Sequence, residues 1–268
     1  MRMALILTPL ILLAACGQEE PAPVATAGAA EVTAPVATEV APPPAQAVDV
    51  KTENSRYSFA YAYPAAAAGI PALRALLDAD LAKSRVELAA NAREGESASK
   101  QDGFDFSPYE QSTRWTLVTE LPGWLSLKRD SYEFTGGAHG NSGTSALLWD
   151  KAANQRRDPL ALFVSKAAFD AALRGAFCDA LDRERGKRRG APVDRTSGDG
   201  FEECLAPSSI TVLLGSSNRQ QFNRIGFVAD PYAAGPYAEG SYEVTLPVTP
   251  ALIQAVRPEY RALFAAGR

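Results

Sequence analysis

The sequence predicts an α+β domain with helices packed on an antiparallel sheet, in the order β-α-β-β-β-α-β-β-β-α. Several short segments alternate apolar and polar residues with the period of a strand. Two longer segments repeat apolar residues at the spacing of a helix. Turn residues separate neighbouring strands at short intervals, which favours antiparallel pairing.

The first predicted strand is residues 57–63, where aromatic residues occupy every second position and Pro64 ends the run. A helix is predicted from Pro71 to about Ala92, because proline suits the first turn and leucines recur on one side. The polar stretch 94–103 is expected to follow that helix as a loop.

Three further strands are predicted as a meander: residues 114–121, residues 124–134 and residues 144–150. Pro122 and Gly123 supply the first turn between them. Simple alternation in the first of these strands places four side chains on one face: Trp115, Leu117, Thr119 and Leu121.

A second helix is predicted after Asp158 and Pro159, with an apolar stripe from Phe169 to Leu181. It ends in a basic run, residues 183–189. This run either forms a patch for an anionic surface or complements the carboxyl end of the helix beside a solvated loop, and we favour the second interpretation.

The last third predicts two strands around a turn at residues 215–218, then a strand at residues 241–247 and a short helix from about Pro250. Alternation buries three side chains of the final strand: Tyr242, Val244 and Leu246.

The amino terminus predicts export and lipidation. Residues 1–15 carry a basic residue and then an apolar run too short to span a bilayer, which is typical of a signal peptide. The run ends in Leu13-Ala14-Ala15-Cys16, which resembles the bacterial lipobox, so Cys16 is the expected site of lipid attachment. In Gram-negative lipoproteins a residue such as Gly17 favours the outer membrane. The expected location is therefore that membrane, with the domain facing the periplasm; an ordinary signal peptide is the alternative.

Residues 16–50 are expected to form a disordered tether. The stretch after Cys16 is rich in alanine and proline and lacks lysine, arginine and aromatic residues, so it cannot bury enough apolar surface to fold. The folded domain is expected to span residues 51–268. Net charge is −4 with 46% hydrophobic residues, which is sufficient for a core and leaves no basic excess for a nucleic-acid partner.

Two cysteines remain once Cys16 is lipidated: Cys178 and Cys204, 26 positions apart. An even pair in an oxidising compartment predicts a disulfide, which would stabilise the domain by about 3 kcal/mol. Two buried free thiols are the alternative.

The most distinctive segment is YEFTGGAHGN, residues 132–141, which holds the only histidine of the chain, His139. A strand ending in LLWD, then DPLALF and a helix, follow it. A second marker is IGFVADPYAAGPYAEGSYEVTLP, residues 225–247. Together these motifs resemble the extracytoplasmic domain shared by the lysozyme-sensing anti-sigma factor RsiV and the peptidoglycan deacetylase PdaC. The resemblance covers residues 50–268.

This resemblance implies an α+β fold with helices on a sheet. It implies no enzymatic activity, cofactor or metal for the module, because the deacetylase carries its chemistry in a separate catalytic domain. It also implies possible partners, namely peptidoglycan, a lysozyme-like protein or another envelope protein.

His139 admits three interpretations. A hydrolase would need a positioned nucleophile, and the sequence contains no nucleophile elbow near this histidine. A tight hairpin connection is favoured, in which Gly136, Gly137 and Gly140 supply positive φ. A binding rim is the third interpretation, since loops on rigid sheets often carry function. Its candidate residues are Thr135, Gly136, Gly137, His139, Asn141, Tyr232 and Tyr237.

Overall fold

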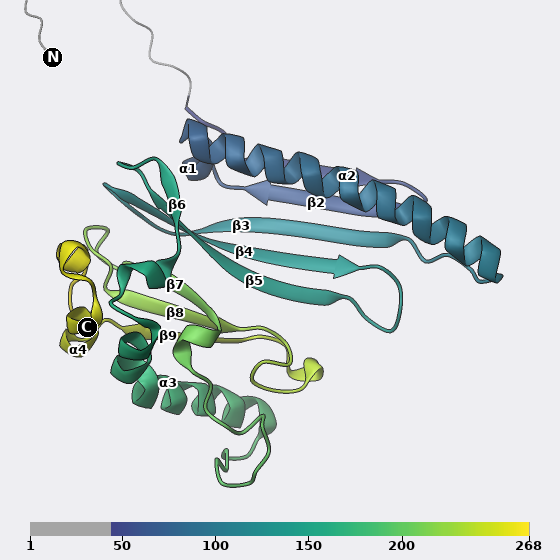
Figure 1. The fold of residues 1–268 in the computed structure, drawn as a ribbon. Helices are drawn as coiled ribbons and strands as arrows, with labels where there is room; N and C mark the ends of the chain where they lie inside the picture. Colours follow the sequence, from purple (N-terminus) through teal and green to yellow (C-terminus); the bar gives the residue numbers. More distant parts are fainter. Residues whose placement is uncertain (1–43, 268) are drawn as a thin grey trace, which may run out of the picture. The chain divides into compact units, whose positions relative to one another are not determined.

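The computed structural model describes residues 44–267 (Figure 1). The predicted signal peptide, the predicted lipidation at Cys16 and most of the predicted tether lie outside the described residues. Between residues 44 and 267, no helix is both long enough and apolar enough to cross a membrane. The predicted α+β class is confirmed, although the strands form two sheets rather than one.

The first sheet has six strands in sequence order. They are β1 (Val48–Glu53), β2 (Tyr57–Tyr63), β3 (Tyr109–Leu121), β4 (Trp124–Phe134), β5 (Asn141–Asp150) and β6 (Gln155–Arg157). The predicted meander is β3 to β5, and β2 pairs with β3 in parallel because a helix crosses over between them. The sheet is therefore mixed rather than antiparallel throughout.

Strand β1 corrects the predicted boundary of the tether. Residues 48–50 were expected to be disordered, but Val48 and Val50 pair with Tyr63 and Tyr61 across an antiparallel ladder. The apolar residues of this short segment alternate at a period of two, which is the pattern of a strand despite the adjoining Ala/Pro-rich stretch.

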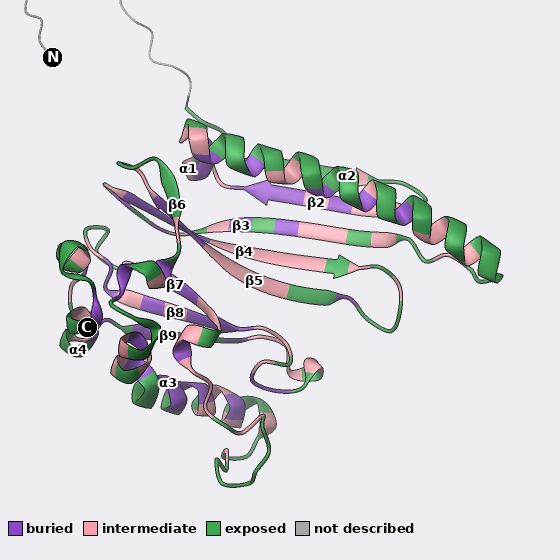
Figure 2. Cartoon of the chain, viewed as in Figure 1, coloured by how far each residue is buried: buried purple, intermediate pink, exposed green. Residues whose placement is uncertain are grey.

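Helices α1 (Ala65–Ala68) and α2 (Pro71–Asp102) lie on one face of this sheet. In Figure 2 the side of α2 toward the sheet is largely buried and the opposite side is exposed. Leu73, Leu77 and Leu88 pack with Tyr61 and Tyr63 in one core cluster. The hydroxyls of Tyr61 and Tyr63 donate hydrogen bonds to carboxylates of α2. Burial, together with the hydrogen bond to Asp78, raises the pKa of Tyr63 to about 12.

The expected end of this helix at Ala92 is wrong, because α2 continues to Asp102 and stops at Gly103 in the left-handed conformation. The polar stretch stays helical through charge pairing. Glu96 binds Lys100 one turn later at 3.0 Å and Arg56 of the neighbouring β1–β2 connection at 2.6 Å.

A β-bulge at Val118 corrects the predicted face of β3. Leu117 pairs with Leu127, whereas Thr119 pairs with Ser126, so the extra residue reverses the alternation. Trp115 therefore faces α2, while Leu121 faces the other core, and Leu117 is left 45% exposed. Simple alternation could not show this, since a bulge has no fixed signature in one sequence.

The second sheet has three antiparallel strands, β7 (Thr211–Gly215), β8 (Arg224–Ala229) and β9 (Tyr242–Pro247). Helix α3 (Lys166–Arg189) covers one face of it, and α4 (Pro250–Ala255) lies near its end (Figure 1). The predicted burial of Tyr242, Val244 and Leu246 is confirmed. Short 3-10 turns connect these elements: η1 (Pro159–Leu162), η2 (Pro207–Ser209), η3 (Tyr237–Glu239) and η4 (Pro258–Leu263).

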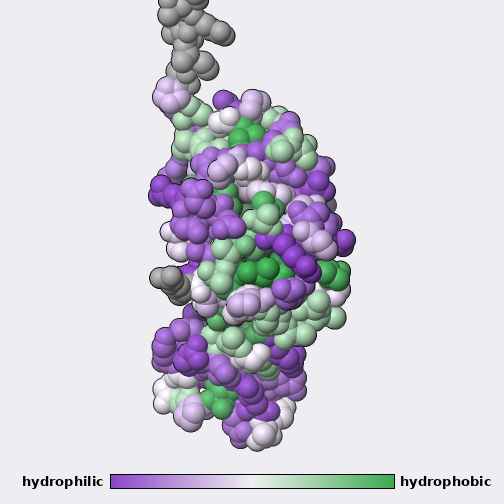
Figure 3. All heavy atoms as spheres, turned by 90° about the vertical axis from the view of Figure 1, so that its left-hand side faces the viewer, coloured by the Kyte–Doolittle hydropathy of each residue, from purple (hydrophilic) through white to green (hydrophobic). Residues whose placement is uncertain are grey.

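A second core cluster joins the two sheets. Phe169, Phe177 and Phe227 pack together between α3 and β8, and Trp124 of the first sheet meets Phe222 with ring centroids 6.5 Å apart. On the face drawn in Figure 3, hydrophobic residues gather toward the middle and hydrophilic residues border them.

Candidate aromatic binding site

The loop between β4 and β5 takes its shape from three glycines. Gly136 and Gly137 have φ angles of 96° and 92°, as the sequence predicts for a tight connection. Gly140 corrects the prediction, since its φ is not positive. A Cβ on Gly140 would lie 2.4–2.5 Å from the ring of Tyr132, so this glycine is required for the close approach of that ring.

A second loop, residues 230–241 between β8 and β9, meets the first. The ring of Tyr237 stacks on the ring of His139, with centroids 3.9 Å apart and planes at 21°. The hydroxyl of Tyr237 donates a hydrogen bond of 2.8 Å to the carbonyl oxygen of Gly140. The two sequence motifs, about a hundred residues apart, therefore form one surface.

Tyr232 completes this surface. Its ring lies 5.5 Å from that of Tyr237, it is 56% exposed, and its φ is 69°. A non-glycine residue in the left-handed region costs roughly 1 kcal/mol or more, and such strain is concentrated at functional sites. We refer to His139, Tyr232 and Tyr237 as the aromatic ledge.

The other predicted rim residues do not join the ledge. Thr135, Gly136 and Gly137 lie at the tip of the loop, and neither glycine has an atom within 4 Å of an added Cβ. Asn141 is an exposed residue of β5 that shares a sheet face with Gly143 and lines a separate hollow. The sequence placed these residues in one rim, but strand alternation separates them.

Two arginines of α3 hold the Tyr237 loop in place. Arg189 pairs with Glu239 through Nε–Oε1 at 2.9 Å and Nη2–Oε2 at 3.0 Å. Arg188 lies over the ring of Tyr242, 4.0 Å from its centroid, and donates to the carbonyl of Glu239. The hydrogen bonds from Arg189 lower the pKa of Glu239, whereas burial raises the pKa of Tyr242.

Arg185 reaches the same loop from inside the domain. Its side chain is fully buried, and its Nε donates to the carbonyl of Ala234 at 2.9 Å. Its Nη1 donates to Glu203 at 3.0 Å and to Asp182 at 3.2 Å. These contacts correct the expectation that the basic run only complements a helix end, because three of its arginines anchor the loop of the ledge.

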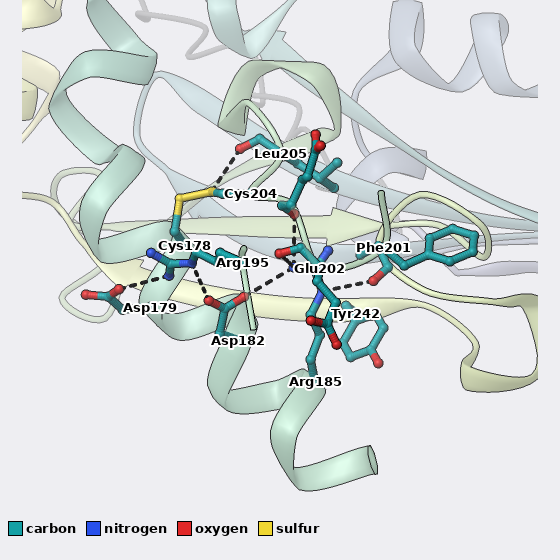
Figure 4. A network of polar contacts seen from close by, with 12 residues as sticks. Cys178, Asp179, Asp182, Arg185, Arg195, Phe201, Glu202, Cys204, Leu205 and Tyr242 are labelled. Atoms are coloured by element: carbon teal, nitrogen blue, oxygen red, sulfur yellow. Dashed lines mark hydrogen bonds and ion pairs between the residues drawn. A yellow bond between two sulfur atoms is a disulfide. The ribbon is translucent and has the colours of Figure 1, made fainter. Parts of the chain in front are cut away.

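A covalent link reinforces this region (Figure 4). Cys178 of α3 and Cys204 form a disulfide, with Cα atoms 5.4 Å apart. Arg195 of the enclosed loop binds Asp179 at 3.0 Å and Asp182 at 2.6 Å. Sequence analysis identified the cysteine pair, but it could not find the arginine network because the partners are backbone carbonyls and distant carboxylates.

The base of the ledge is tied to the first sheet through Asp230. Its Oδ2 accepts a hydrogen bond of 3.1 Å from the amide of Thr144. The carbonyl of Thr144 accepts a hydrogen bond of 2.8 Å from the hydroxyl of Thr211. The ledge therefore rests on strands of both sheets.

His139 has few partners for chemistry. Its Nδ1 lies 2.9 Å from the carbonyl oxygen of the adjacent Gly140. In the part of the chain that the structure describes, no serine or carboxylate forms a hydrogen bond or ion pair with its ring, and no group of three metal-ligating side chains is found. The geometry presents aromatic surface and backbone carbonyls, which suits recognition by stacking.

The fold and the ledge together define a two-sheet α+β domain in which two loops form an exposed aromatic surface. Residues 50–142 match the family model described as Deacetylase PdaC, about a third of the chain. This segment is similar to the PdaC domain family, in agreement with the resemblance to the PdaC and RsiV domain. The match contains the GGAHG motif, whereas the second marker, residues 225–247, lies beyond it.

Two solved structures of domains of unknown function are similar to the chain. A DUF3298 family member from Bacteroides fragilis has 16% identity and a TM-score of 0.48, covering 76% of this chain and 90% of its own. A DUF3298 family protein from Pseudomonas aeruginosa has 17% identity and a TM-score of 0.48, covering 84% of this chain and 99% of its own. No curated protein matches this chain.

Proposed function

We propose that this chain is a lipid-anchored protein of the cell envelope whose domain binds a wall ligand without catalysing a reaction. The aromatic ledge is the contact surface. Its three rings project from two loops that five side-chain contacts hold in place, and this exposed, fixed aromatic surface is the observation that carries the proposal.

The ligand class that the ledge favours is a glycan of the cell wall. Sugar rings bind to flat aromatic side chains through their apolar faces, and a tyrosine presents such a face beside a polar hydroxyl. The Tyr237 hydroxyl donates a hydrogen bond to Gly140, so the ring must break this bond to turn away from its stacked position. The loop does not need to become ordered when ligand binds, which reduces the cost of binding.

Catalysis is not proposed. A general base must lie within hydrogen-bonding reach of a nucleophile or of substrate, and the ring of His139 is stacked with one nitrogen directed at its own loop. The deacetylase activity in the family description is not transferred, because the resemblance places that chemistry in a separate domain.

The test is cosedimentation of the full chain with purified peptidoglycan sacculi, beside a pull-down with immobilised lysozyme and a screen for esterase and amidase activity. We expect retention on sacculi by the wild type, loss for Tyr237→Ala, and no hydrolysis. The matched control is Phe104→Ala, which removes an aromatic ring that is 74% exposed and is not one of the three ledge residues.

If the protein is retained on immobilised lysozyme but not on sacculi, the ligand is a protein rather than a glycan. Hydrolysis that His139→Ala abolishes without unfolding the protein would refute the non-catalytic proposal. The membrane anchor is tested separately: Cys16→Ser should prevent incorporation of labelled palmitate and release the protein from membranes.

A further inference from the structure

Arg129 lies at the centre of β4 on the sheet face opposite Tyr132. In the strand register it pairs with Trp115 of β3 on one side and with Ser145 of β5 on the other. These three residues share the face on which α2 packs, because alternate residues of a strand point to opposite faces. Arg129 and Tyr132, the residue that packs on the loop of the ledge, therefore start from opposite faces of the sheet, although both line one hollow.

The guanidinium of Arg129 has no acidic partner. Its Nη2 donates a long hydrogen bond of 3.3 Å to Thr113 Oγ1, and its Cζ lies 6.0 Å from the ring centroid of Trp115. Its Nε is buried without a hydrogen-bond partner. Among residues 44–267, no carboxylate oxygen lies within 4.0 Å of it. A partly buried charge without a counter-ion lowers the stability of the folded protein, so the presence of this arginine in the sheet requires an explanation.

Two adjoining hollows share Arg129 as a wall. One has a volume of about 310 Å³ and is also lined by Trp115, Ser145, Arg156 and Asp80. The other has a volume of about 250 Å³ and is lined mainly by neutral polar residues, including Thr113 and Asn141, together with Tyr132 and the acidic Glu133. We refer to the two together as the Arg129 trough.

The charges in the larger hollow favour an anion. Arg156 of β6 is exposed, and within residues 44–267 its one hydrogen bond goes to the carbonyl of Ala146, at 3.4 Å. Asp80 is the acidic residue that lines this hollow, and its Oδ2 accepts a hydrogen bond of 2.7 Å from the Tyr61 hydroxyl. Two arginines thus line the larger hollow with one carboxylate, and Glu133 of the smaller hollow is the second carboxylate of the trough.

We propose that the Arg129 trough binds the carboxylate of a polar ligand, with Arg129 and Arg156 as its counter-ions. A guanidinium matches the planar geometry of a carboxylate with two parallel donors, and the hydroxyl and amide side chains of the smaller hollow supply donors and acceptors for a neutral polar body. The carboxylate belongs either to the free end of a peptide or to an acidic sugar. This site is distinct from the ledge and does not depend on the proposed function.

The test is isothermal titration calorimetry on the full chain with two matched pairs of probes. N-acetyl-alanyl-alanine with a free carboxylate is compared with its amide, and methyl glucuronide is compared with methyl glucoside. We expect at least one acid to bind tenfold or more tightly than its neutral counterpart, and the acid that does so identifies the source of the carboxylate.

Arg129→Met should weaken binding of that acid at least tenfold, and Arg156→Met at least threefold. Arg114→Met is the matched control, because Arg114 is exposed on the opposite face of the adjacent strand. If Arg129→Met fails to fold, the affinity of the exposed Arg156→Met variant for the acid tests the proposal instead. Equal binding of acid and neutral probes, no saturable binding of either acid, or unchanged binding in both trough variants would overturn the proposal.

Discussion

Arg189 of α3 binds Glu239 of the aromatic loop through two nearly parallel hydrogen bonds, 2.9 Å and 3.0 Å long. Both side chains are about one fifth exposed, so solvent screens the pair only in part. Tyr237 lies two residues before Glu239. The pair therefore connects the end of a helix to the position of the ring that stacks on His139.

The first prediction concerns pH. Because the pKa of Glu239 is lowered in the folded protein, the pair contributes stability above the ordinary value of 4.5, and this contribution is lost as pH falls through the folded value. Glu239→Gln should therefore lower the free energy of unfolding near pH 7 by about 1.5–3 kcal/mol, and the difference from wild type should shrink below about pH 4.

Urea unfolding at several pH values checks this prediction. The control is Glu87→Gln, which breaks an exposed pair with Lys83 on α2. That variant should change stability by less than about 1 kcal/mol at any pH. A difference between Glu239→Gln and wild type that is constant with pH would contradict the account.

The second prediction concerns the buried arginine. Arg185→Met removes four donated hydrogen bonds and leaves the carbonyls of Ala234, Glu202 and Glu203 without this partner. We expect a loss of about 3–5 kcal/mol in the free energy of unfolding. Arg183→Met, an exposed position two residues earlier, is the matched control and should be nearly neutral. Similar losses in both variants would show that the helix, rather than the network, is responsible.

The third prediction concerns the disulfide. Replacing Cys178 and Cys204 by alanine should lower stability by about 3–4 kcal/mol, because the bond closes a loop of 26 residues. Reductant should lower the melting temperature of the wild type and leave that of the double variant unchanged. Two alkylatable thiols in wild-type protein isolated from the periplasm would contradict the pairing.

The fourth prediction separates conformation from packing in the GGAHG loop. Neither Gly137 nor Gly175 has an atom within 4 Å of an added Cβ, but only Gly137 has a positive φ. The same substitution should therefore have opposite effects. Gly137→Ala should destabilise the protein by about 1–2 kcal/mol, whereas Gly175→Ala in the exposed middle of α3 should stabilise it by up to about 1 kcal/mol. Calorimetric melting of both variants checks this, and equal shifts would refute it.

Local pattern was sufficient to predict much of the fold. The aromatic alternation of β2, the Pro-Gly hairpin between β3 and β4, and the alternation of β9 all have the structure expected of them. The predictions that were wrong concern two details that local pattern does not specify: a bulge in a strand and the end of a helix. The bulge at Val118 is seen in the register of β3 with β4, and the extended part of α2 pairs through Glu96 with Lys100 on the same helix and with Arg56, 40 residues away.

The candidate site shows the same division. His139, Tyr232 and Tyr237 were each identified from sequence, but nothing in either motif indicated that their rings would stack. Asn141 was grouped with His139 by proximity, yet it lies on the strand that follows the loop and lines the trough. Arg129 was not identified, because an arginine within a strand has no sequence signal that distinguishes an unpaired guanidinium from a solvated one.

The most direct test of the central claim measures the dissociation constant for fragmented peptidoglycan glycan. Three forms of the full chain are compared: the wild type, the double variant Tyr232→Ala/Tyr237→Ala, and Phe104→Ala. The account predicts at least a tenfold loss for the ledge variant, since stacked aromatic contacts contribute about 0.5–1.5 kcal/mol each beyond the area they bury. Phe104→Ala should bind as the wild type does. Unchanged affinity of a correctly folded ledge variant would contradict the claim that the aromatic ledge is the contact surface.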